Sequence, residues 1–287
     1  MSANGSGANG TDRVRIEIAD GVADVRLNRP DKMNALDPAM FMALLAAGER
    51  LAAEPGLRAA VLSGEGRAFC AGLDMASFAR MAQDGGANPL GGDVAARTHG
   101  PANPYQQVAL VWRSLPVPVI AAVHGVALGG GFQIMLGADM RYVAPDAKLS
   151  VMEIKWGLVP DMGGALLMRE LARADVIREL TFTGRVFSGE EAVAYGFATR
   201  TEADPRSAAL ATGREIAGKS PEAIRAAKRL LNTADEALAA KILLRESLEQ
   251  KELIGSPGQK EAVAANAAGR SPAFADPAQP ALASTLS

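Results

Sequence analysis

Short apolar segments that alternate with helix-forming segments restrict the fold of this chain more than any other feature. Residues 14–27 predict a β-hairpin around an Asp-Gly turn, because apolar and polar residues alternate on both sides of the turn. Residues 57–64 and 117–125 are short apolar runs typical of buried strands. After the hairpin, Asp37 and Pro38 open an Ala/Met/Leu-rich helix as its N-cap and first residue. Strands that alternate with helices predict the α/β class.

Composition and charge argue against nucleic acid and membranes as partners. The 287 residues carry a net charge of −2, without a basic excess that would bind phosphate backbones. Hydrophobic residues make up 48% of the chain, enough for a sizeable core in one large or two small domains. No apolar run reaches the roughly 18 residues of a membrane helix. The single cysteine, Cys70, rules out a disulfide framework, so we expect a buried thiol and a cytoplasmic location.

The chain divides into four stretches by composition and pattern. Residues 1–12 are polar and rich in Gly, Asn and Ser, which predicts a disordered tail without a secretory signal. Residues 13–200 form the predicted α/β core, although the pattern is nearly all helical from about residue 172 onward. Residues 201–270 predict a helical C-terminal region, and residues 271–287 an irregular Pro/Ala-rich tail.

Local signals add a loop and two capped helices. Residues 83–104 are dense in Gly, Pro and Asn, which predicts a mobile surface loop and a candidate lid. Ser188, followed by Glu191 three residues later, predicts a capping box at the start of one late helix. Ser220 precedes a proline and predicts the start of another. We expect the apolar faces of the late helices to pack on a neighbouring subunit.

Two glycine-rich turns follow the predicted strands. The first lies in GEGRAFCAGLDM, where Ala71 and Gly72 let another molecule approach the backbone and leave the N–H of Leu73 free to donate. The second is the triple glycine 129–131, which precedes a helix whose first N–H groups form a site for negative charge. It lacks the Lys-Ser/Thr of a phosphate loop and the glycine spacing of a dinucleotide site. Close helix–sheet packing is the alternative explanation for these glycines.

Two carboxylates, Glu153 and Asp161, lie in the mostly apolar stretch SVMEIKWGLVPDMGG. Apolar surroundings raise the pKa of a carboxyl group toward the range in which it exchanges protons at neutral pH, so both acids are candidates for proton transfer. The alternative is that each acid caps a helix or pairs with a base. Lys148, Lys155 and Arg169 are close enough in sequence for such pairs.

Taken together, the three segments resemble the crotonase (enoyl-CoA hydratase/isomerase) superfamily. The resemblance covers about residues 14–270 and rests on RAFCAGLD, VHGVALGGGF and MEIKWGLVPDMGG in this order. It implies a spiral of β-β-α repeats followed by C-terminal helices that build homotrimers, often paired into hexamers. It also implies an enzyme that acts on an acyl-CoA thioester and needs no cofactor beyond the coenzyme A of its substrate.

The resemblance assigns roles to individual positions. The N–H groups of Leu73 and Gly130 would form the oxyanion hole that holds the thioester oxygen, and removing one such donor costs roughly 10²–10³ in rate. Glu153 occupies the position of a catalytic glutamate of the family. Gln133 stands where family hydratases have their other glutamate, and an amide orients water but does not transfer protons as a carboxylate does.

The position of Asp161 favours an isomerase. Dienoyl-CoA isomerases of the family carry a Glu and an Asp with the eight-residue separation of Glu153 and Asp161, although they usually have a third acid where Gln133 stands. The preferred reaction is therefore double-bond isomerisation of an enoyl- or dienoyl-CoA by a proton relay between the two acids. A 2-enoyl-CoA hydratase that uses Glu153 with Gln133 orienting water is the alternative. A non-catalytic acyl-CoA-binding subunit is the alternative from another class, but it would need no paired acids. Family dehalogenases have an aromatic residue where this chain has Glu153, which argues against dehalogenation.

The remaining expected contacts concern substrate binding. Arg29 and Lys32 match the family segment near the phosphates of coenzyme A, although a solvated turn is equally consistent with them. Four further residues would contact substrate through bare backbone or an apolar side chain: Ala71, Gly72, Gly129 and Trp156. Asp74 is expected to cap or orient the turn after Leu73. No histidine–acid cluster has metal-ligand spacing, so we expect no metal.

Overall fold

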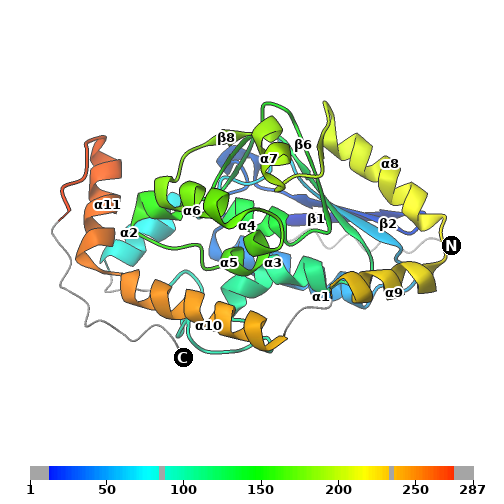
Figure 1. Cartoon of the computed structure of the whole chain (residues 1–287), viewed down its shortest axis with the longest axis horizontal. Helices are drawn as coiled ribbons and strands as arrows, with labels where there is room; N and C mark the ends of the chain where they lie inside the picture. The colour runs from blue at the N-terminus through cyan, green and yellow to red at the C-terminus, as the bar shows by residue number, and fades with distance from the viewer. Residues whose placement is uncertain (1–12, 84–87, 233–235, 275–287) are drawn as a thin grey trace.

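The computed structural model describes residues 13–83, 88–232 and 236–274. The predicted tail 1–12 and all but the first four residues of the predicted tail 271–287 lie outside the described part. Residues 88–103 of the predicted loop are turns and irregular backbone. In the described part, one large sheet and one small sheet lie among helices (Figure 1).

The large sheet begins with the predicted hairpin. Strand β1 (Val14–Ala19) pairs antiparallel with β2 (Val22–Leu27), and Asp20 and Gly21 form the turn between them. The following strands all run parallel to β2: β3 (Ala59–Gly64), β4 (Val119–Val123), β6 (Met140–Val143) and β9 (Arg200–Thr201). The sheet has six strands in the order β1-β2-β3-β4-β6-β9, so the predicted hairpin and buried strands are confirmed.

Successive turns of the chain alternate between the two sheets. After β4 the chain enters the small sheet as β5 (Val126–Leu128) and then forms helix α4 (Gly130–Leu136). After β6 it returns to the small sheet as β7 (Lys148–Ser150), which is followed by the 3-10 turn Glu153–Trp156 and by α5 (Gly164–Arg169) and α6 (Ala174–Thr183). This repetition is the expected β-β-α spiral.

Two strands lie in the region whose pattern is nearly all helical. The small sheet ends with β8 (Phe187–Ser188), next to α7 (Gly189–Tyr195), and the large sheet ends with β9. The nearly all-helical pattern predicted after residue 172 holds except at these two short strands. Each strand has two residues, which is too short for an alternating pattern to distinguish it from a loop or a helix end.

Helices cover both faces of the large sheet. Ala60 and Leu62 of β3 face the main core, which they share with α1 (Pro38–Ala52) and α3 (Pro104–Ser114). Val61 faces the opposite side, where α8 (Pro205–Ala217) packs on β2, β3, β4 and β6 (Figure 1). Helix α8 therefore covers the sheet of the core, although it follows the boundary expected at residue 200.

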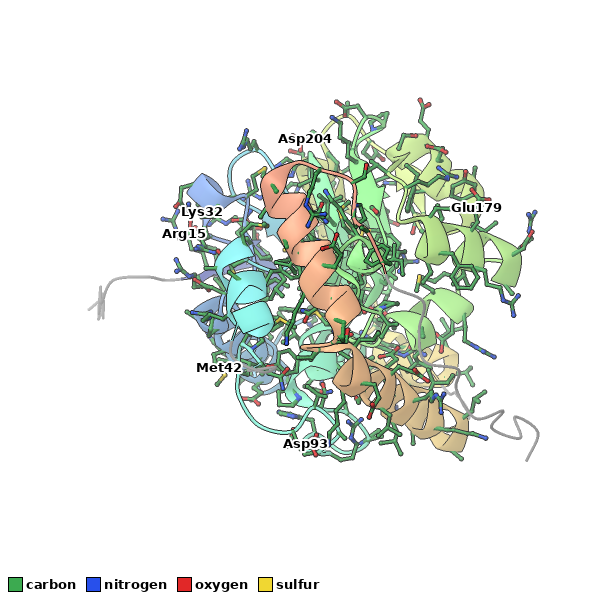
Figure 2. All side chains as sticks on the ribbon, turned by 90° about the vertical axis from the view of Figure 1, so that its left-hand side faces the viewer. Arg15, Lys32, Met42, Asp93, Glu179 and Asp204 are labelled. Carbon is green, nitrogen blue, oxygen red and sulfur yellow. The ribbon has the colours of Figure 1, made fainter. Side chains whose placement is uncertain are left out.

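The last helices extend along one side of the molecule. Helix α10 (Glu236–Leu253) packs on α5, and α11 (Pro257–Ala268) packs on α2 (Met75–Gln83) and on the 3-10 turn. Figure 2 shows α11 crossing the front of the molecule beside α2, with Lys32 at the outer surface. The predicted N-caps Asp37, Ser188 and Ser220 are all present, and Ser188 forms its capping box with Glu191. Among the helices that the structure describes, none is long and apolar enough to cross a membrane.

Lys228 fastens α9 (Pro221–Leu231) to the core. Its side chain is 7% exposed and donates to the carbonyl oxygens of Trp112 at 3.3 Å and Val117 at 2.8 Å. It also pairs with the Asp139 carboxylate at 2.8 Å. A buried charge is tolerated only when its partners satisfy it, so these contacts fix α9 against the end of α3.

Replacing Lys228 with methionine should therefore lower the free energy of unfolding by roughly 3 kcal/mol, because Asp139 loses its charged partner and keeps, among the described residues, only the N–H of Val119. Urea denaturation measures the loss. Lys219→Met is the matched control, since the Lys219 side chain is 60% exposed and pairs with Glu215 at 4.0 Å. Equal losses in the two variants would contradict this role for Lys228.

Candidate active site

A main-chain bridge joins the two glycine-rich turns. The N–H of Cys70 donates to the carbonyl of Val126 at 3.0 Å, and the N–H of Leu128 donates to the carbonyl of Cys70 at 3.1 Å. A Cβ atom on Gly131 would lie 2.4 Å from the Cys70 carbonyl oxygen, so glycine is required where α4 starts against this bridge. Cys70 itself is fully buried, and burial raises the pKa of its thiol to about 12, which confirms the expectation of a buried thiol.

The bridge places two main-chain donors at one cavity. Gly130 is the first residue of α4, and the N–H groups of a first helical turn have no partner within the helix. Leu73 is bridged to Leu36 through the carbonyl of Gly72 and the N–H of Asp74, so its own N–H points to the other side. Within residues 13–83, 88–232 and 236–274, neither the Leu73 nor the Gly130 N–H has a hydrogen-bond acceptor.

Glycines are needed where the two turns meet. Gly72 has a φ of +84°, and a Cβ atom on it would lie 2.5 Å from the Leu128 carbonyl oxygen and 3.7 Å from the Gly130 nitrogen. Gly129 has a φ of +51°, a conformation that residues with a side chain rarely adopt. Leu73 and Gly130 thus lie on neighbouring backbone, at the wall of a cavity of about 750 Å³.

Glu153 lies directly beside this wall. Its side chain is 8% exposed, and a Cβ atom on Gly129 would approach its Oε1 to 3.2 Å. Oε1 accepts a hydrogen bond from Gln133 Nε2 at 2.6 Å, while the buried Oε2 has no partner among the described residues. Burial raises the pKa of Glu153 to about 7, against which the Gln133 hydrogen bond acts only partly. One oxygen of Glu153 is therefore held in place, and the other is buried without a hydrogen-bond partner among the described residues.

Gln133 lies behind Glu153 and does not line the cavity. Its Nε2 donates to Glu153, and its Oε1 accepts from the N–H groups of Met162 at 2.8 Å and Gly164 at 3.0 Å. The side chain is 1% exposed. In this position the amide orients Glu153 and ties it to the turn that follows Asp161.

Asp161 is half-buried at the cavity wall. Burial raises the pKa of Asp161 to about 8, and the nearby carboxylates of Glu153 and Glu246 raise it further, whereas a hydrogen bond from Gln250 lowers it. In the part of the chain that the structure describes, neither Glu153 nor Asp161 forms an ion pair. The N-cap of α5 is Gly163, so Asp161 is not its capping residue either. The structure therefore does not support the alternative that these acids cap helices or form ion pairs with basic residues.

Apolar side chains line the rest of the cavity. Trp156 lines the cavity and stacks on Phe78 with ring centroids 4.3 Å apart. Tyr105 and Gln250 are polar lining residues that the sequence did not single out. The Tyr105 hydroxyl accepts a hydrogen bond from the N–H of Leu90 at 2.8 Å, which fixes part of the loop before α3 over the cavity. Other lining side chains are Phe41, Val94, Leu158, Met162 and Ile254.

The two basic residues at the cavity differ in their surroundings. Arg29 donates to the Asp74 carboxylate at 2.5 Å and lies 3.6 Å from that of Asp37. Lys32 is exposed (Figure 2). Asp74 also accepts from the N–H of Ala76 at 2.9 Å, so it orients the turn after Leu73 as expected. Of the expected site residues, all but Gln133 line the cavity: Arg29, Lys32, Ala71, Gly72, Leu73, Gly129, Gly130, Glu153, Trp156 and Asp161.

The structure thus combines a spiral fold with two main-chain amides and two acids at one cavity wall. Known proteins are similar to this chain in sequence and fold. A family model described as enoyl-CoA hydratase/isomerase matches residues 17–277. The mitochondrial Delta(3,5)-Delta(2,4)-dienoyl-CoA isomerase of Homo sapiens is 35% identical over 226 residues, which are 76% of this chain and 68% of that protein.

Two further comparisons agree. The (E)-benzylidenesuccinyl-CoA hydratase of Thauera aromatica is 32% identical over 219 residues, 75% of this chain and 80% of the relative. The crystal structure of an enoyl-CoA hydratase/isomerase from Mycobacterium paratuberculosis superposes with a TM-score of 0.78 and 26% identity over 88% of this chain and 97% of that one. The chain belongs to the enoyl-CoA hydratase/isomerase family of the crotonase superfamily. The resemblance, the fold class and the assignment as an enzyme are confirmed, and the family acts on acyl-CoA thioesters.

The raised pKa of Asp161 predicts a stability effect that depends on pH. Between the ordinary value of 3.8 and about 8, the unfolded chain has released the Asp161 proton while the folded protein retains it. Stability therefore falls as the pH rises through this window. Asp161→Asn removes this penalty. The free energy of unfolding of the variant should therefore exceed that of the original protein by an amount that grows to a few kcal/mol at pH 8 and stays constant above it.

Urea denaturation at a series of pH values measures this gain. Asp146→Asn serves as the control because Asp146 is exposed. A stability difference between Asp161→Asn and the original protein that does not change with pH would show that Asp161 has an ordinary environment.

Proposed function

We propose that this protein isomerises a 3,5-dienoyl-CoA to the 2,4-dienoyl-CoA. The observation that carries the proposal is the pair of carboxyl groups, Glu153 and Asp161, at one cavity wall without a neutralising base. Both have pKa values near the operating pH, as general acid–base catalysis requires. The relatives named Delta(3,5)-Delta(2,4)-dienoyl-CoA isomerase support this reaction.

The thioester oxygen would bind to the N–H groups of Leu73 and Gly130. Removing a proton from C2, next to the thioester carbonyl, places negative charge on this oxygen, and donors already aimed at it stabilise that charge without reorganising. Glycine at positions 72 and 129 lets the thioester reach the bare backbone. The side chain of Leu73 is not the donor, so its chemistry matters less than the course of the main chain.

The two acids would divide the proton transfer. Glu153 lies against Gly129, beside the oxyanion site, so its carboxyl group would take the C2 proton. The resulting dienolate spreads its charge from the thioester oxygen to C6. Asp161, at the same cavity wall and with a raised pKa, would deliver its proton to C6. One C–H bond breaks at C2 and one forms at C6, so no redox cofactor is needed, and the coenzyme A is part of the substrate.

Hydration of a 2-enoyl-CoA is the second candidate, supported by the relative named (E)-benzylidenesuccinyl-CoA hydratase. It requires a group that positions and deprotonates water beside Glu153. Gln133 uses its amide to hold Glu153, Met162 and Gly164, and it lies behind the wall. A non-catalytic acyl-CoA-binding subunit would have no use for two buried acids, whose burial costs free energy.

Binding and assembly complete the proposal. Lys32, with Arg29 behind it, would face the phosphates of coenzyme A at the cavity mouth. Exposed leucines on the last helices would form the contacts of a homotrimer or a hexamer, and Leu230 and Leu231 are 74% and 81% exposed. The buried, reduced Cys70 leaves the cytoplasm as the proposed location.

Substitution of the two acids tests the reaction. With 3,5-dienoyl-CoA as substrate, Glu153→Gln and Asp161→Asn should each lower kcat by roughly 10²–10⁴, because each removes one of the two proton-transfer groups. Diene formation is followed by ultraviolet absorbance, and calorimetry with a saturated acyl-CoA checks that binding survives. Rapid hydration of 2-enoyl-CoA that persists in Asp161→Asn would replace the isomerase proposal with the hydratase.

Two glycine-to-alanine substitutions test the role of the main-chain donors. Gly72→Ala should lower kcat by roughly 10²–10³, because the added Cβ would collide with the Leu128 carbonyl and separate the two donors. Gly56→Ala is the control for backbone strain alone, since Gly56 also has a positive φ of +76° but nothing within 4 Å of the added atom. Equal activity in both variants would argue against an oxyanion hole at this place.

A further inference from the structure

Helix α10 holds the turn that carries Asp161 from both sides. Glu246 accepts hydrogen bonds from the N–H groups of Gly163 at 2.9 Å and Ala165 at 2.8 Å, which follow Asp161 in the chain. Gln250 accepts from the N–H of Val159 at 3.2 Å, which precedes Asp161, and its side chain lowers the pKa of the Asp161 carboxyl. Glu246 and Gln250 are four residues apart, so they lie on one face of the helix.

The position of α10 is itself fixed by α3 and the loop before it. Gln106 of α3 donates to the Leu243 carbonyl at 2.6 Å and to the Glu246 carboxylate at 3.1 Å. The Ser247 hydroxyl accepts from Arg97 at 2.8 Å and from Asn103 at 3.1 Å. The contact between α10 and the Asp161 turn is thus part of a buried polar network, in which each group is set by several others.

Glu246 brings a third buried acid close to the site, although it does not line the cavity. Its side chain is 6% exposed, and burial raises its pKa to about 7. The charged groups that interact with Glu246 are Asp161 across the turn and Arg97 of the loop, with the Asp93–Lys251 pair beyond. Glu153 and Tyr105 of α3 lie near Asp161. A negative charge at Glu246 favours the protonated form of Asp161, whereas the Gln250 hydrogen bond favours the ionised form.

From these contacts we infer that Glu246 and Gln250 are positioning residues for Asp161, through which α10 sets both the place and the protonation of the proton donor. The contacts stand on their own, and the catalytic consequence rests on the proposed isomerase. In that reaction Asp161 must carry a proton and reach the far end of the diene. A turn anchored on both sides keeps the distance constant, and the opposing effects of Glu246 and Gln250 hold the proton affinity in a usable range.

The test uses two variants for which the inference predicts shifts of opposite sign. In Glu246→Gln the negative charge is lost, so Asp161 ionises more easily and the alkaline limb of the kcat–pH profile moves down by roughly 0.5–1 pH unit. In Gln250→Met the amide that lowers the pKa of Asp161 is lost, so the limb moves up by a similar amount. The full-length chain and 3,5-dienoyl-CoA are used throughout.

Glu249→Gln is the matched control, because Glu249 lies on the same helix with a side chain 45% exposed and pairs with Arg245. Its profile should match that of the original protein. Variants that lower kcat without moving the limb, or that move it in the same direction, would overturn the inference and leave α10 as a purely structural support.

A second measurement does not depend on turnover. The pH-dependent stability difference between each protein and its Asp161→Asn counterpart reports the titration of Asp161 together with its coupling to Glu153 and Glu246. The pH at which this difference levels off should fall in the Glu246→Gln pair and rise in the Gln250→Met pair. If the original protein lacks isomerase activity, the proposed function fails while these shifts still decide the inference. Identical curves in all pairs would overturn it.

Discussion

The main-chain bridge between Cys70 and the strand that ends at Leu128 is the contact on which the site depends. It brings together two turns that are more than fifty residues apart in the sequence, and it leaves the Leu73 and Gly130 amides without acceptors at one wall. The glycines around it follow from the close approach of two backbones. The spiral makes this possible, because from β4 onward the chain alternates between the large and the small sheet.

Buried acids give the site its chemistry at a cost in stability. Burial raises the pKa of Glu153, Asp161 and Glu246, and the charges of Glu153 and Glu246 both oppose the ionisation of Asp161. Burial without a base is unfavourable for a carboxylate, and the amide groups of Gln133 and Gln250 moderate this effect without cancelling it. Such an arrangement keeps protons on carboxyl groups near neutral pH, which a proton relay needs.

The features that could be predicted from the sequence are those that residues close together in the chain determine. The N-caps at Asp37, Ser188 and Ser220 and the hairpin turn at Asp20 are local, so their residue types and spacing were sufficient. The roles of Leu73 and Gly130 came from the family resemblance, since a turn alone does not reveal which amides converge. Glu246, Gln250 and Tyr105 gave no signal: contacts between α10 and residues some eighty positions earlier depend on how helices pack. Likewise, the pattern could not show that Gln133 lies behind Glu153.

A crystal structure of the protein with a bound saturated acyl-CoA tests the account most directly, through the distances from the thioester oxygen to the two main-chain nitrogens. The account predicts that this oxygen lies roughly 2.7–3.2 Å from the nitrogens of both Leu73 and Gly130, with the adjacent acyl carbon facing Glu153. An oxygen bound elsewhere in the cavity, or an acyl chain directed away from Glu153, would contradict it.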